Sequence, residues 1–374
     1  MNSSPDRRPD AWYARRLAPP RSRPRVVIDT DAANEIDDAF ALAWALLSPD
    51  RLDLLAVYAV PFSFEHRRQE MRRALQARAA PERATAFDGE LLRQHGARLD
   101  RFERKGWSLD AIAHWPVFCT PGQGMLRSFD EILRVFDQLQ IDPADRVFRG
   151  SAGYLPSETE PLASDAVAHL IASARATPAA PDGKSDPLYV VAIGCVTNIA
   201  SALLLAPDIA ERIVVVWTSG YPSHAPQTNF SLNLEQDMAA SRVLFDSGVP
   251  LVYLPGFQVG AQLRLSLPEM ALHVQPRGAI GAYLHRLYLH NPLADFAGIE
   301  VHAAGFSWVM WDLINIAWLL NPDWVPSEIV ATPLLGADRR WRQGAGRHPM
   351  REAHAVARDP IFADLFARLA TAPA

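Results

Sequence analysis

The chain has 374 residues, of which 49% are hydrophobic and 21% charged, so it can fold around a sizeable core and is not disordered throughout. A formal net charge of −5 argues against a nucleic-acid-binding protein, because such proteins are usually basic. The two cysteines, Cys119 and Cys195, lie far apart, so we expect no disulfide framework and a cytoplasmic location. No apolar run reaches the roughly 20 residues that span a bilayer, and we expect no membrane association.

The N-terminal region changes character at residue 25. Residues 1–24 are rich in arginine and proline and are expected to form a disordered tail. The apolar run at 25–29 then predicts a buried parallel strand, 39–47 a buried helix and 53–58 a second strand. Together these three elements form a βαβ unit.

Residues 63–120 interrupt this rhythm, because they are crowded with arginine, glutamate and histidine. We interpret this segment as an insertion at the rim of a sheet. After it, apolar side chains between residues 125 and 139 fall on one helical face.

The alternation of strands and helices returns in the second half of the chain. Strands are expected at 189–194, 212–217 and 251–254, and helices at 197–205, 237–247 and 306–320. We therefore predict a single α/β domain over residues 25–374, with an open, mainly parallel sheet and helices on both faces.

The most informative segment holds four aspartates and one glutamate between Asp29 and Asp38, at the carboxyl end of the first strand. Open α/β sheets bind ligands at this end. Carboxylates so close together need a cation, and oxygen ligands favour Ca²⁺ or Mg²⁺. A preference for acidic residues at a helix start would explain Asp37 and Asp38 without a ligand, but not Asp29 and Asp31.

The pattern Asp29-Thr30-Asp31 followed by Asp37-Asp38 resembles the N-terminal signature of the nucleoside hydrolase family (inosine/uridine-preferring type), although the two acidic pairs are two residues further apart than is usual there. Three later segments resemble family motifs in the family's order: a glycine-to-Thr-Asn turn, an asparagine-containing substrate loop and a late acidic ligand, at Gly194–Ala200, Asn233–Asp237 and Trp311-Asp312. The resemblance covers most of residues 25–370 outside the insertion, and it implies a Rossmann-like core.

The resemblance also implies a site. A Ca²⁺ ion at the pocket floor would have protein ligands from Asp31, Asp38, Asp312 and the backbone carbonyl of Ile193. Asp31 would also be the general base that deprotonates a calcium-bound water, which a carboxylate beside a cation can do. Asp37 and Asn233 would bind ribose hydroxyls, and Asp29 would support the loop from behind.

The implied reaction is cleavage of the N-glycosidic bond of a ribonucleoside into free base and ribose. Trp311 occupies a position where many relatives have a histidine, and it is expected either to stack on a purine base or to be a core tryptophan. The family's contacts to the 5′ end of the sugar are replaced by Ser231, Ala225 and Phe62-Ser63. Recognition of that end of the substrate is therefore expected to differ.

Two alternatives remain open. A member of the same fold could bind a ribosyl ligand with weak or no catalysis. A Mg²⁺-dependent haloacid-dehalogenase-like phosphatase also begins with Asp-x-Asp, but it needs a suitably placed lysine, and the chain has only Lys105 and Lys184. The expected partners are a small nucleoside and other copies of the chain, as a dimer or tetramer.

Overall fold

The computed structural model describes residues 8–21, 23–179, 182–291, 293–297 and 305–373. Its centre is an eight-stranded sheet with the order β3-β2-β1-β4-β5-β6-β12-β9. Neighbouring strands run parallel except for the edge strand β9, which is antiparallel to β12. The strands are β1 (Arg25–Thr30), β2 (Asp53–Ala59), β3 (Val147–Arg149), β4 (Leu188–Ala192), β5 (Ile213–Ser219), β6 (Leu251–Pro255), β7 (Arg264–Ser266), β8 (Ser307–Val309), β9 (Ser327–Ala331), β10 (Leu334–Leu335), β11 (Trp341–Arg342) and β12 (Pro349–Ala353).

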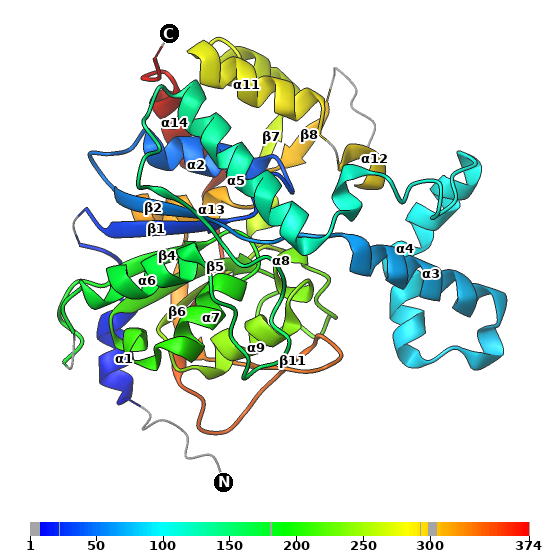
Figure 1. Ribbon diagram of the computed structural model, residues 1–374, viewed down its shortest axis with the longest axis horizontal. Coiled ribbons are helices and arrows are strands. Elements are labelled where there is room, and N and C mark those ends of the chain that lie inside the picture. The colour runs from blue at the N-terminus through cyan, green and yellow to red at the C-terminus, as the bar shows by residue number, and fades with distance from the viewer. Residues whose placement is uncertain (1–7, 22, 180–181, 292, 298–304, 374) are drawn as a thin grey trace.

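Helices cover both faces of this sheet, so the predicted fold class is confirmed (Figure 1). One apolar core joins the sheet to α2, α5, α11, α13 and α14, and a second joins it to α6, α7 and α9. The helices on these two faces are α2 (Asp37–Leu46), α5 (Pro121–Gln138), α6 (Asp165–Arg175), α7 (Thr197–Leu205), α9 (Met238–Asp246), α11 (Gly278–Leu289), α13 (Leu313–Leu320) and α14 (Arg358–Leu369). Three short helices lie between the others, α8 (Leu232–Glu235), α10 (Leu267–Glu269) and α12 (Ala294–Ala297).

The central strands are buried because helices cover both of their faces. Every residue of β4 and β5 is buried, as expected for Val- and Ile-rich parallel strands. In the register, Asp29 of β1 lies opposite Tyr58 of β2 and Ala192 of β4. The carboxyl ends of these three strands therefore lie at the same edge of the sheet. Asp31 is the first residue after β1, and Ile193 is the first residue after β4.

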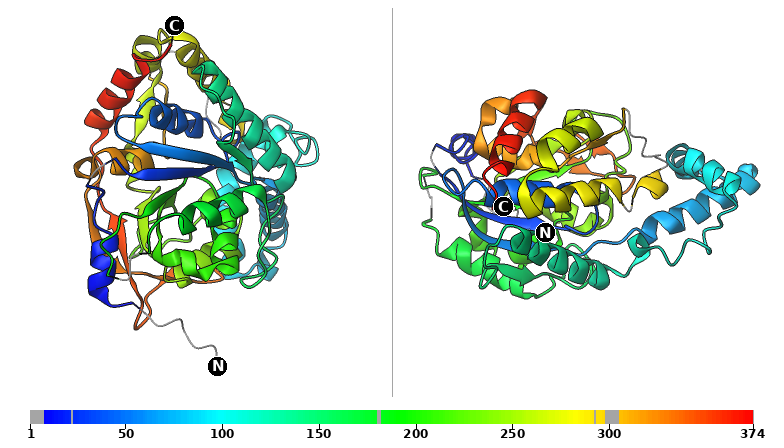
Figure 2. Two further views of the ribbon diagram at one scale, coloured as in Figure 1. Left: turned by 60° about the vertical axis from the view of Figure 1, so that its left-hand side comes forward. Right: turned by 90° about the horizontal axis from the view of Figure 1, so that it is seen from above.

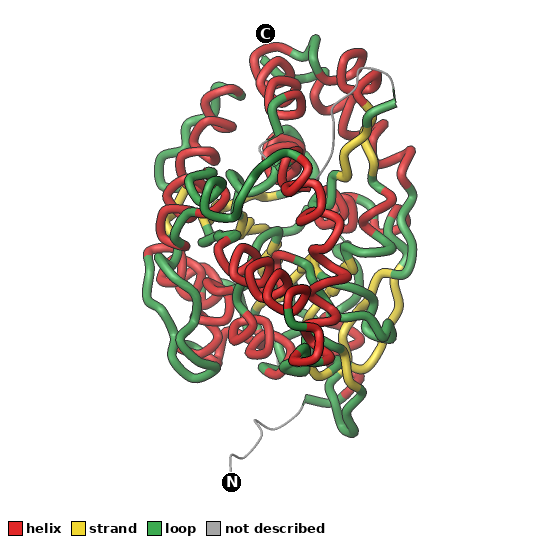
Figure 3. Tube along the Cα trace, turned by 90° about the vertical axis from the view of Figure 1, so that its right-hand side faces the viewer, coloured by secondary structure: helices red, strands yellow, loops and turns green. Residues whose placement is uncertain are grey.

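Residues 63–120 form a helical hairpin that projects from this edge. Helices α3 (Glu65–Ala79) and α4 (Ala86–Arg104) lie side by side away from the sheet, as Figures 1 and 2 show. Figure 3 shows the molecule from the side on which the hairpin lies. Trp107 and Trp115 pack edge to face, with ring centroids 5.3 Å apart. No helix within the described ranges is both long and apolar enough to cross a membrane.

The expectation of a disordered N-terminal tail is wrong for residues 10–17. Asp10–Arg16 form helix α1, which packs against the sheet through Trp12, Tyr13 and Leu17, each 3% exposed or less. The hydroxyl of Tyr13 donates to the carbonyl of Gly248 at 2.8 Å. The abundance of arginine and proline predicted disorder, although the segment also holds these three apolar side chains. Residues 1–7 and 22 of the expected tail lie outside the described residues.

The predicted helix at 306–320 is also only partly correct. Ser307–Val309 form strand β8, which pairs antiparallel with β7, and helix α13 begins only at Leu313. A short apolar run can form either a strand or a helix, and here pairing with β7 decided the outcome. The break between β8 and α13 holds Trp311 and Asp312.

Candidate active site

A pocket of about 240 Å³ opens at the carboxyl ends of the central strands. Its floor is acidic, and its walls carry aromatic and amide side chains. All seven residues predicted for the site from the sequence line this pocket, namely Asp31, Asp37, Asp38, Ile193, Asn233, Trp311 and Asp312.

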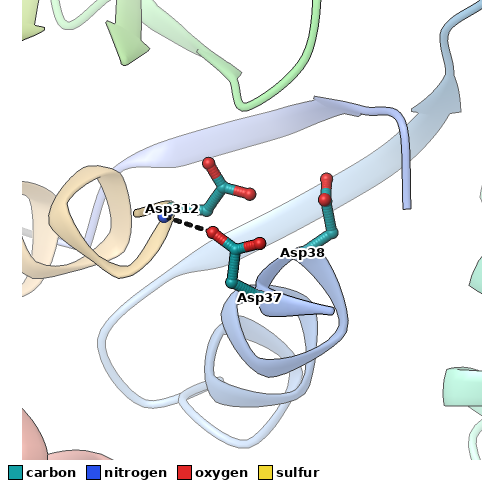
Figure 4. A group of neighbouring side chains, drawn as sticks. All are labelled: Asp37, Asp38 and Asp312. Atoms are coloured by element: carbon teal, nitrogen blue, oxygen red, sulfur yellow. Dashed lines mark hydrogen bonds between the residues drawn. The ribbon is translucent and has the colours of Figure 1, made fainter. Parts of the chain in front are cut away.

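Three buried aspartates form the floor. The carboxylates of Asp37, Asp38 and Asp312 each place an oxygen within 4.8 Å of the other two. Asp37 and Asp38 belong to the first turn of α2, and Asp312 precedes α13 (Figure 4). The backbone N–H of Asp312 donates to Asp37 Oδ2 at 3.1 Å, and the hydroxyl of Thr30 donates to Asp38 Oδ1 at 2.5 Å. These two bonds fix the relative positions of the carboxylates.

Burial has a large electrostatic effect on this floor. Burial, followed by repulsion from neighbouring carboxylates, raises the pKa of Asp38 and of Asp312 well above the usual range. Burial also raises the pKa of Asp37 to about 6, against the hydrogen bond from Asp312. Within the described residues, Asp37 Oδ1 is buried without a hydrogen-bond partner. A cluster of this kind is suited to a cation rather than to further hydrogen-bond acceptors.

Asp31 lies at the side of this floor, held by neighbouring amides. Asn34 Nδ2 donates to Asp31 Oδ2 at 2.9 Å, and Gln236 Nε2 donates to the same oxygen at 3.3 Å. Burial raises the pKa of Asp31 to about 7, although these two hydrogen bonds oppose the shift. A Cβ atom at Gly194 would lie only 2.8 Å from Asp31 Oδ1, so glycine lets the backbone approach the carboxylate.

The other predicted residues occupy the pocket walls. Asn233 Nδ2 donates to the carbonyl of Ile193 at 3.1 Å, which places the predicted ribose ligand beside the predicted metal ligand. Trp311 packs edge to face against Phe257, with ring centroids 5.8 Å apart, and it lies in the pocket wall rather than in the core. By contrast, Trp308 and Trp318 are core residues, as expected.

Two further expectations concerned Asp29 and the alternative of a haloacid-dehalogenase-like phosphatase. Asp29 does not line the pocket, and its Oδ1 accepts a hydrogen bond from Asn198 at 2.9 Å. Neither Lys105 nor Lys184 lines the pocket, so the phosphatase interpretation lacks the lysine that it needs.

Sequence reasoning assigned no role to four further residues that line the pocket or contact Asp31. Asn34 and Glu35 belong to the two-residue extension of the acidic motif, and their place in that extension was a signal that could have been used. Arg67 of α3 lines the wall, so the insertion contributes to the pocket, and Gln236 contacts Asp31 from the segment after α8. Gln236 lies in the Asn233–Asp237 segment that resembles the family's substrate loop, which was a signal, whereas nothing local in the sequence indicates Arg67.

Glu235 joins the insertion to the pocket wall. Its side chain is fully buried, and it accepts from Arg67 at 2.6 Å and from Arg339 at 2.8 Å. His66 lies 3.1 Å from the same carboxylate, and Arg339 also pairs with Glu70 of α3. Although burial opposes it, these cationic neighbours, Arg67 foremost, hold the pKa of Glu235 well below its usual value.

Comparison with known proteins gives a consistent picture. The model of the family described as inosine-uridine preferring nucleoside hydrolase matches residues 26–357. A non-specific ribonucleoside hydrolase RihC from Salmonella schwarzengrund is 25% identical over 303 residues, which cover 80% of this chain and 79% of the relative.

Solved structures show the same fold. A purine-preferring ribonucleoside hydrolase from Gardnerella vaginalis superimposes with a TM-score of 0.58 at 17% identity, covering 92% of this chain and 98% of that one. An inosine-guanosine nucleoside hydrolase gives a TM-score of 0.59 at 15% identity, over 94% of this chain and 100% of that one. At these identities the structural likeness establishes the fold.

Proposed function

Because this chain belongs to the inosine-uridine preferring nucleoside hydrolase family, we propose that it hydrolyses the N-glycosidic bond of ribonucleosides with Asp31 as the general base. The observation that carries this proposal is the buried group of Asp37, Asp38 and Asp312 at the floor of a pocket that Asp31 and Trp311 also line.

The residues present fit a hard divalent cation. The side-chain donors at the floor are carboxylate oxygens, which are the ligands that such a cation prefers. Asp37 Oδ1, which has no partner among the described residues, is left to accept from a ribose hydroxyl. We propose Ca²⁺, held by Asp31, Asp38, Asp312 and the carbonyl of Ile193. When bound, such a cation would neutralise part of the negative charge and make a coordinated water more acidic.

The side chains then have separate tasks. Asp31 accepts a proton from the water that attacks the anomeric carbon of the ribose. Asp37 and Asn233 bind ribose hydroxyls and orient the sugar over the floor. The carboxylates beneath the ring stabilise the positive charge that develops on the sugar as the bond to the base breaks.

The leaving base would contact the part of the pocket wall that carries Trp311 and Phe257. Trp311 lies beside Phe257, and we propose that it stacks on the base and favours purine nucleosides. Both cysteines are buried and unpaired, which agrees with action in the reducing cytoplasm, and we propose that the chain works as a dimer or tetramer.

A steady-state assay of base release tests the proposed function. The purified protein is given inosine, guanosine, adenosine, uridine and cytidine, with Ca²⁺ or with an excess of chelator. We expect release of free base that the chelator abolishes, and a loss of at least about 100-fold in kcat for Asp31→Asn at matched calcium occupancy. Binding of nucleosides without release of base by the calcium-loaded protein would favour the non-catalytic alternative.

A further inference from the structure

Two amide groups converge on one oxygen of the Asp31 carboxylate. Asn34 reaches Oδ2 from the same loop, and Gln236 reaches it from the segment that follows α8. All three side chains are buried, at 7% exposure or less. We propose that Gln236 and Asn34 are positioning residues, which fix the plane of the Asp31 carboxylate and leave Oδ1 to accept the proton of the attacking water.

The argument begins with the capacity of a carboxylate oxygen. Each oxygen of an ionised carboxylate offers about two lone-pair sites for hydrogen bonds. The two amides occupy both of these sites on Asp31 Oδ2, at 2.9 Å and 3.3 Å. The second oxygen, Oδ1, packs against the backbone of Gly194, where a Cβ atom would lie only 2.8 Å from it. Both side-chain amides bond to Oδ2, so the lone pairs of Oδ1 are left for the attacking water and for the cation that Asp31 is proposed to hold.

The orientation of the Gln236 amide follows from its other contacts. Its Oε1 accepts from the backbone N–H of Ser63 at 3.3 Å and from the hydroxyl of Tyr154 at 2.8 Å. A backbone N–H can only donate, so the atom that faces Ser63 must be the carbonyl oxygen. The NH₂ group of Gln236 is consequently directed at Asp31.

Asn34 is fixed in a different way. Its own backbone N–H donates to the carbonyl of Asp31 at 2.7 Å, and this bond closes a turn that brings the Asn34 side chain back to the carboxylate. Asn34 belongs to the lengthened acidic motif, whereas Ser63 opens the insertion. Two of the departures of this chain from the usual family pattern thus act on the proposed base, Asn34 directly and Ser63 through Gln236.

Such restraint matters because proton transfer depends on geometry. A displacement of about 1 Å in a reacting group can lower a rate by about 100-fold. Loss of a side chain that orients a metal ligand typically costs about 10- to 100-fold in activity or in metal affinity. This inference rests on the proposed function, since it assigns Asp31 the role of base.

The test replaces Gln236 with methionine, which has a similar length but cannot donate a hydrogen bond. The matched control is Gln138→Met, at a glutamine that lies on the outer part of α5 and bonds only to Asp137 in the described structure. We measure kcat and KM for inosine at saturating Ca²⁺, and Ca²⁺ affinity by calorimetry. For Gln236→Met we expect kcat to fall about 10- to 100-fold with KM changed less than about threefold, and the control to match the wild type.

A kcat within about twofold of the wild type, or a rise in KM alone, would overturn the proposal. If Gln236→Met does not fold, Tyr154→Phe replaces it, because this variant removes only the hydroxyl that orients Gln236. We expect kcat of Tyr154→Phe to fall at least about threefold. An unchanged kcat would count against the proposal. If the wild type releases no base from any nucleoside, the proposed function fails separately. In that case calcium affinity tests whether Gln236 positions Asp31. Weaker calcium binding in Gln236→Met but not in Gln138→Met supports this role, and equal affinities overturn it.

Discussion

At the scale of single residues, the proposed role of Trp311 in recognising the base can be tested apart from the chemistry on the sugar. It adjoins Asp312 in sequence but lies in the pocket wall against Phe257, while Asp312 lies at the floor. Replacing Trp311 therefore removes an aromatic surface without removing a carboxylate.

We predict that Trp311→Ala reduces kcat/KM for inosine more than for uridine. Stacking of a base on an aromatic side chain is worth about 1–3 kcal/mol, which corresponds to about 5- to 150-fold in rate. The measurement is the ratio of kcat/KM for the two substrates, with calcium affinity as the control. An equal loss on both substrates would contradict stacking, and a wild-type preference for uridine would contradict a purine site.

The residues that line the pocket were predictable from the sequence where they belong to short local motifs. Asp31, Asp37 and Asp38 lie in one ten-residue segment, and Trp311 lies beside Asp312. Gln236 could not be assigned, because its contact with Asp31 joins residues 205 positions apart. Only the folded chain creates such a contact.

At the scale of elements, helix α1 shows how composition can conceal order. Its apolar side chains are few, but Trp12, Tyr13 and Leu17 are all buried. The helix also binds chain segments at the amino ends of central strands, since Arg16 donates to the carbonyl of Ser185 at 2.6 Å and Tyr13 to that of Gly248. It therefore lies at the opposite end of the sheet from the pocket.

We predict that Trp12→Ala lowers the free energy of unfolding by about 3–5 kcal/mol, the usual cost of emptying a buried tryptophan site. Because α1 is remote from the pocket, kcat measured well below the unfolding transition should stay at the wild-type value. Urea denaturation gives the first quantity, and Arg21→Ala in the same segment, at an exposed residue, is the control. A stability equal to that of the control would mean that α1 contributes little to the fold.

Buried charges help to hold the insertion in place, beside the aromatic contacts that Phe64 and Phe118 make with Phe296. Glu235 is buried between Arg67 of α3 and Arg339, so removing its charge leaves two poorly hydrated guanidinium groups. We predict that Glu235→Gln destabilises the protein by about 3–5 kcal/mol. The matched control is Glu65→Gln on α3, where a more exposed pair with Arg68 should contribute about 0–1 kcal/mol. Equal unfolding free energies for the two variants would refute this role of Glu235.

At the scale of the whole molecule, five of the eight strands of the central sheet were predicted, because strands and helices alternate with different apolar patterns. The edge strands β3 and β9 and the neighbouring strand β12 were not predicted. The sheet and its parallel strands follow from that rhythm. The region from residue 306 to 312 was not predictable in the same way, because β8 depends on pairing with β7, which no local pattern reveals.

The floor of the pocket joins distant parts of the chain. Asp38 belongs to α2 in the N-terminal region and Asp312 precedes α13 near the C-terminal end, so one ion would tie the two together. A ligand that binds only the folded state stabilises it by about 2.7 kcal/mol at 100 times its Kd. We predict a corresponding rise in Tm when Ca²⁺ is added to the chelator-treated wild type.

The variant Asp312→Ala should lose this calcium-dependent rise in Tm. In calcium-free buffer it should be at least as stable as the wild type, because one of several mutually repelling buried carboxylates is gone. Asp130→Ala, at an exposed residue of α5, is the control and should keep the full rise. The same rise in both variants would show that the ion binds elsewhere.

Three of the four consecutive residues 233–236, in helix α8 and directly after it, contact different parts of the molecule. Asn233 contacts the carbonyl of Ile193, Glu235 holds the insertion, and Gln236 holds Asp31. Successive residues of a helix are rotated by about 100°, so adding or deleting one residue here would turn every later side chain away from its partner at once. The length of this segment is therefore a stronger constraint than any one of its residues, because a single substitution breaks one connection and a change of length breaks all three.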